Sequence, residues 1–127
     1  MPAAEGFSYA ILRVVPRLER GEQLNVGVVL YCRRLKFLAA RVELDEERLR
    51  AIDPRCDAAG VRPALDAIVA VAAGTGDGPL SRLEPSERFG WIAAPSSTIV
   101  QPSPVHTGLT TDPQADLDRL FTQLVLL

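Results

Sequence analysis

The residues best suited to chemistry gather in one proline-, serine- and threonine-rich segment, residues 91–112. The segment contains the only histidine of the chain, one amide, several hydroxyl groups and three prolines. Polar groups on a stiff, partly extended frame suit a binding surface. The candidate binding residues in this segment are Ser97, Thr98, Gln101, Ser103, His106 and Thr107.

His106 has two interpretations that lead to different functions. In a small enzyme, this single imidazole would be the general base, with a hydroxyl of residues 96–98, Ser103 or Thr107 as the nucleophile. Asp112 would then orient the ring. The chain has no G-x-S-x-G pattern, so only closeness in the sequence supports catalysis. The favoured alternative is that His106 and its neighbours hydrogen-bond the backbone of turns.

Arginines offer a second kind of site, because a guanidinium binds phosphate or carboxylate through two parallel hydrogen bonds. The arginines of the predicted strands and turns are Arg13, Arg17, Arg20, Arg33, Arg34 and Arg41. If Arg13 and Arg41 converge with the others on one face or edge of a sheet, they form a nucleotide or anion site. The favoured alternative is that these side chains are solvated or form weak surface ion pairs with nearby glutamates.

Composition and charge disfavour several classes of function. A chain of 127 residues is expected to form a single domain, 1–127, and its net charge of −2 provides no positive field for general nucleic-acid binding. One histidine and two distant cysteines do not supply the usual ligands of a metal, and we expect no cofactor. The N-terminus does not resemble a signal peptide, and the apolar run 24–32 is shorter than the roughly 18–20 residues of a membrane span. We therefore expect a cytoplasmic protein without a membrane partner.

The secondary structure that must position these residues follows from apolar patterning. Aromatic and β-branched residues predict strands over 7–15, 24–32 and 36–43, joined as an antiparallel meander. A further strand is expected over 97–101, followed by irregular extended backbone at Pro102 and Pro104. Apolar residues at helical spacing predict two main helices, over 58–73 and 112–126. Shorter helices are expected over 45–52 and 85–93.

These elements predict an α+β fold, with an antiparallel sheet of three to four strands and two main amphipathic helices packed on it. The strand over 24–32 is almost wholly apolar, which indicates that both of its faces are covered. Helices would cover one face, and a second subunit would cover the other. The pattern therefore raises the hypothesis of a homodimer.

Three stretches of the chain resemble the bacterial domain-of-unknown-function family 3037. They are FSYAILRVVP over 7–16, ERGEQLNVGVVL over 19–30, and FGWIAAPSSTIVQPSPVHTGL over 89–109. The resemblance covers nearly the whole chain, and the third stretch is long and unusual enough to be specific. No activity is assigned to the family, so the resemblance implies no catalytic residue. It does imply a partner, because such proteins are often encoded beside a Hip-type, toxin-like kinase homologue.

The sequence thus favours a small cytosolic binding or regulatory protein without enzymatic activity. Its Pro/Ser/Thr-rich loop, residues 95–112, would contact a protein partner, for which a co-encoded Hip-type kinase homologue is the candidate. The alternative is a small enzyme, or a nucleotide- or anion-binding domain, that uses His106 with nearby hydroxyls or the arginine cluster.

Overall fold

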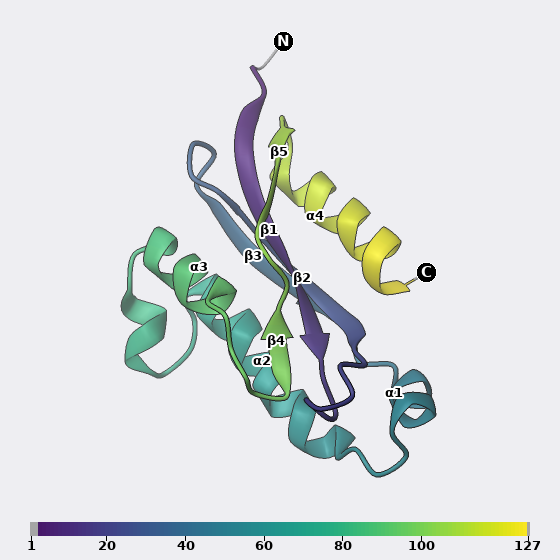
Figure 1. The fold of residues 1–127 in the computed structure, drawn as a ribbon. Helices are drawn as coiled ribbons and strands as arrows, with labels where there is room; N and C mark the ends of the chain where they lie inside the picture. Colours follow the sequence, from purple (N-terminus) through teal and green to yellow (C-terminus); the bar gives the residue numbers. More distant parts are fainter. Residues whose placement is uncertain (1–2, 127) are drawn as a thin grey trace.

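The centre of the fold is a five-stranded antiparallel sheet, seen in a computed structural model that describes residues 3–126. Strands β1 (Glu5–Val14), β2 (Leu24–Cys32) and β3 (Phe37–Val42) form the expected meander, in the order β3-β2-β1. Two short strands, β4 (Val100–Pro102) and β5 (His106–Thr110), lie end to end along the outer side of β1 (Figure 1). The predicted α+β class is confirmed.

Strands β4 and β5 together form one interrupted edge of the sheet. β4 pairs with the C-terminal half of β1, where Arg13 lies opposite Gln101, and β5 pairs with the N-terminal half, where Tyr9 lies opposite His106. The fourth predicted strand is therefore present but begins later, at Val100. β5 was not predicted, because the two prolines before it break the strand pattern, whereas β1 is long enough to pair beyond them.

Gly27 allows the close approach of β2 to its neighbours. The register between β1 and β2 shifts there, because Leu12 pairs with Gly27 and Arg13 pairs with Asn25. A Cβ atom at Gly27 would lie 2.8 Å from the backbone oxygen of Arg41. A larger residue would therefore force the strands apart.

One face of the sheet is covered by the helices that lie between β3 and β4. α2 (Ala58–Ala73) and α3 (Pro85–Ala93) contribute most of this core, in which Tyr31 of β2 stacks on Phe89 at a ring distance of 5.4 Å. α1 (Glu46–Ile52) adds Leu49, and a short 3₁₀ turn, η1 (Pro79–Arg82), joins α2 to α3. The four helical segments expected from the sequence are therefore present, counting the C-terminal one described next.

The other face is covered by α4 (Pro113–Phe121), which continues as a π-helical turn, η2 (Thr122–Leu126). Figure 1 shows α4 alone on its side of the sheet. The apolar stripe of α4 packs on Val28 and Leu30 of β2. Both faces of β2 are thus covered by helices of the same chain, so its burial does not require the second subunit suggested by the sequence. None of the helices within residues 3–126 is long and apolar enough to span a membrane.

Candidate functional site

Ser103 is the residue that joins the two edge strands to β1. Its backbone N–H donates to the oxygen of Ile11 at 2.7 Å, and its Oγ accepts the N–H of Ile11 at 2.8 Å. The same hydroxyl donates to the oxygen of Pro104 at 2.9 Å, and the residue is 3% exposed. Ser103, predicted as a candidate binding residue, is therefore engaged inside the protein and is not available to a ligand in this structure.

The polar residues before β4 tie their own turn together. The Thr98 hydroxyl donates to the oxygen of Val100 at 2.8 Å, and Gln101 Nε2 donates to the oxygen of Thr98 at 2.9 Å. The hydroxyls of Ser96 and Thr98 lie 2.8 Å apart. Ser97 is exposed. This turn is solvent-facing and internally hydrogen-bonded, and Ser97 is the residue whose side chain makes no hydrogen bond within the described residues.

His106 and Thr107 are exposed at the beginning of β5. The imidazole of His106 stacks on the ring of Tyr9 at 5.2 Å. Asp112 does not orient this imidazole as the enzymatic interpretation requires, because its carboxylate accepts the N–H of Ala115 and caps α4. The structure therefore places His106 on an open strand edge, with an aromatic contact as its defined interaction.

The outer side of β5 has unpaired backbone groups. Ser103 donates to Ile11 and Val15 donates to the oxygen of Ile99, so odd-numbered residues of β1 direct their backbone groups toward this edge. The direction of hydrogen bonding alternates along a strand. His106, Gly108 and Thr110, which lie opposite odd-numbered residues of β1, therefore face inward. The N–H and C=O groups of Thr107 and Leu109 face away from the sheet.

An apolar groove lies beside β4, on the α2 and α3 side of the sheet. Its cavity of about 460 Å³ is bounded by α2 at Ile68, by Trp91 of α3, and by residues 94–96 and Thr98. Leu12 and Pro102 form the floor at the sheet. Trp91 is 51% exposed although it is a large aromatic residue. The segment after α3 thus builds one wall of a largely apolar recess.

Several exposed apolar side chains belong to the segment from α3 to β5. Seven large hydrophobic residues are exposed among the described residues, and four of them fall between 91 and 109. These four are Trp91, Ile99, Val105 and Leu109. Leu109 is the most exposed, at 73%. Contiguous exposed apolar surface commonly marks a contact site, and sequence reasoning pointed to the polar groups of this segment instead.

The arginines of the meander do not gather at one place. Arg41 pairs with Asp118 of α4 at 2.9 Å, and its guanidinium lies 4.2 Å from the ring centre of Phe121. Arg13, by strand alternation, shares the α4 face with Arg41, but β2 lies between their strands. Arg33 and Arg34 occupy the β2–β3 turn, at the opposite end of the sheet from the β1–β2 turn with Arg17 and Arg20.

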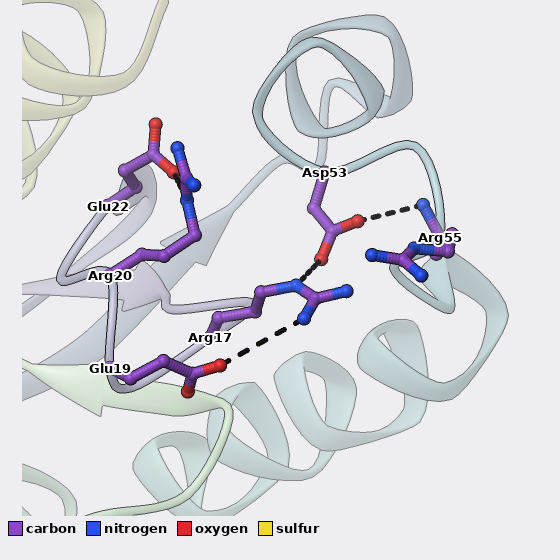
Figure 2. Close-up of polar contacts among 6 residues, drawn as sticks. All are labelled: Arg17, Glu19, Arg20, Glu22, Asp53 and Arg55. Carbon is purple, nitrogen blue, oxygen red and sulfur yellow. Dashed lines mark hydrogen bonds and ion pairs between the residues drawn. The ribbon is translucent and has the colours of Figure 1, made fainter.

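A second, polar cavity of about 510 Å³ lies where the β1–β2 turn meets the end of α1. Figure 2 shows three arginines and three acidic residues from these two segments around it. Asp53 accepts Arg17 Nε at 2.9 Å and the backbone N–H of Arg55 at 2.9 Å. The N–H of Arg55, followed by the Arg17 side chain, lowers the pKa of Asp53. Sequence reasoning missed Asp53 and Arg55, for which only the turn-forming Asp-Pro-Arg tripeptide gave a signal.

The fold and these surfaces define an α+β protein whose antiparallel sheet is covered by helices on both faces and ends in two edges, β3 on one side and β4 with β5 on the other. The family model described as Protein of unknown function (DUF3037) matches residues 9–125, so the chain belongs to that family. This match confirms the resemblance inferred from the three sequence stretches. Neither the curated proteins nor the solved structures gave a match.

Proposed function

We propose that this protein is a non-enzymatic binding protein that holds an extended, apolar segment of a protein partner along residues 94–110. The open backbone edge of β5 is the observation that carries the proposal. A partner strand would pair with the outward N–H and C=O groups of Thr107 and Leu109, in the manner of β-strand addition. Backbone pairing would give affinity, and apolar contacts beside it would give selectivity.

The apolar surface supports the same kind of partner. Leu109 and Val105 are exposed on or next to the open edge, and the groove with Trp91 lies beside β4. A recess of about 460 Å³ has room for one or two large apolar side chains. A strongly charged partner segment would leave this surface exposed to water, so an apolar one fits better.

The family resemblance suggests the identity of the partner. We propose the Hip-type kinase homologue encoded beside such proteins, and a cytoplasmic site for the encounter. His106 and Thr107 are exposed next to the open edge and would contact the partner with their side chains. Ser97, Thr98 and Gln101 belong to the neighbouring turn and would form the polar rim of the same surface.

The edge contact is tested by replacing Thr107 with proline. The N–H of Thr107 faces outward, so Thr107→Pro removes one donor from the open edge without breaking a hydrogen bond to β1. Thr107→Val is the matched control, since it removes the hydroxyl and keeps the N–H. We expect Thr107→Pro to weaken binding of the purified kinase homologue by about tenfold or more, and Thr107→Val to bind like the wild type.

The apolar contact is tested by Leu109→Glu, with Leu35→Glu as the control. Leu35 is also exposed but lies in the β2–β3 turn, outside the proposed surface. We expect only Leu109→Glu to lose the kinase homologue in a binding titration. Equal binding by both variants would refute the surface. Sedimentation of the wild type alone measures whether a second copy of the chain pairs with this edge instead. If the wild type dimerises and Thr107→Pro abolishes the dimer, the occupant of the edge is a second copy and not the kinase homologue.

A further inference from the structure

The polar cavity between the β1–β2 turn and the end of α1 has no part in the proposed strand pairing at β5, although Arg17 and Arg55 also line an adjoining recess with Ile99. Its walls carry Arg17, Arg20 and Arg55, together with Glu19, Glu22 and Asp53. Pro16, Ile52 and Pro54 complete the lining. Three cationic side chains from two separate segments thus open onto one recess of about 510 Å³.

Asp53 holds this arrangement in place. Its side chain is 11% exposed, and its two oxygens are divided between Arg17 Nε and the backbone N–H of Arg55. The carboxylate therefore fixes the guanidinium of Arg17 against the turn that carries Arg55. Arg20 forms a separate ion pair with Glu22.

The guanidinium of Arg55 makes no hydrogen bond or ion pair within residues 3–126, although the side chain lines the cavity. Figure 2 shows it turned toward the guanidinium of Arg17. The Asp53 carboxylate interacts electrostatically with both Arg17 and Arg55 and offsets part of the repulsion between these two cations. A further anion between the two guanidiniums would offset the remainder. Besides Asp53, the acidic group that pairs with Arg17 is Glu19, whose side chain is 72% exposed and whose oxygen lies 3.9 Å from the Arg17 guanidinium.

We infer that this cavity binds a phosphate group between Arg17 and Arg55, with Asp53 as the residue that positions Arg17. One carboxylate is satisfied by a single guanidinium, whereas a phosphate presents three terminal oxygens and up to two negative charges to two guanidinium groups. The phosphate is free or carried as an ester. The exposed Glu19 side chain competes with the phosphate for Arg17. It turns toward solvent when the phosphate binds.

Titration calorimetry with inorganic phosphate tests the site, with sodium chloride at equal ionic strength as the reference. Arg55→Gln should weaken phosphate binding by about tenfold or more, because it removes charge-assisted hydrogen bonds. Arg34→Gln, which neutralises an exposed arginine in the β2–β3 turn, should bind like the wild type. Glu19→Gln should bind phosphate more tightly, since it removes the competing carboxylate.

A phosphoserine peptide, compared with its unphosphorylated form, distinguishes an esterified phosphate from a free one. In NMR titrations of the wild type with inorganic phosphate or with the phosphoserine peptide, the backbone amide signals over 53–57 should shift, which would map binding to the cavity. No saturable binding above the chloride reference in either arm would overturn the inference. So would equal phosphate affinity of Arg55→Gln and the wild type, or shifts confined to other parts of the chain.

Discussion

Replacing Ser103 with alanine should destabilise the protein more than its single missing oxygen suggests. The hydroxyl accepts the N–H of Ile11 and donates to the oxygen of Pro104, and the residue is 3% exposed. Alanine leaves the N–H of Ile11 without its acceptor in a region that water reaches poorly. An unsatisfied buried donor costs about 1–3 kcal/mol. Because Pro104 is exposed, water can replace the second hydrogen bond.

The expected loss in the free energy of unfolding for Ser103→Ala is therefore about 2 kcal/mol. Urea denaturation followed by circular dichroism measures it, through a lower midpoint at an unchanged slope. Ser97→Ala is the control, because Ser97 is exposed and makes no side-chain hydrogen bond within the described residues. It should stay within about 0.5 kcal/mol of the wild type. If Ser103→Ala loses no more than Ser97→Ala, then Ser103 does not join the edge strands to β1.

Two further predictions concern the β1–β5 pair and the polar cavity. Gly108→Ala should lower the free energy of unfolding by about 1–3 kcal/mol, because the new Cβ would lie 2.7 Å from the Phe7 ring. Gly6→Ala is the control, since there is open space around Gly6, and it should cost less than Gly108→Ala in the same urea titration. The lowered pKa of Asp53 means that its contribution to stability is complete above its ordinary pKa of 3.8 and is lost as the pH falls through the folded value. In acid titrations, Asp53→Asn should therefore lose less stability below pH 3.8 than the wild type, and parallel curves would contradict this.

Much of the fold was predictable because local patterns and tertiary packing agree. The apolar run of β2 indicated burial on both faces, and the stripe of Leu117, Leu120 and Phe121 identified the helix that covers one of them. The pattern of β2 could not specify which segments of the protein cover its two faces. The second face is covered by the same chain, because α4 returns over the sheet after β5.

The candidate site was less predictable, because its features depend on contacts between distant segments. Ser103 bonds to Ile11, which lies 92 residues away, and nothing in a serine between two prolines indicates burial. Arg17 meets Asp53 across 36 residues, without a shared motif. The convergence of the meander arginines, which was the less favoured interpretation of the sequence, does not occur, because successive turns of a meander lie at opposite ends of the sheet.

The open edge of β5 is tested most directly by amide hydrogen exchange. In the free protein, the N–H groups of Thr107 and Leu109 face away from the sheet and should exchange rapidly, whereas that of Gly108 should be protected by its pairing with Phe7. On addition of saturating Hip-type kinase homologue, the amides of Thr107 and Leu109 should exchange slowly as well. If the two amides still exchange rapidly in the complex, the partner does not pair with this edge.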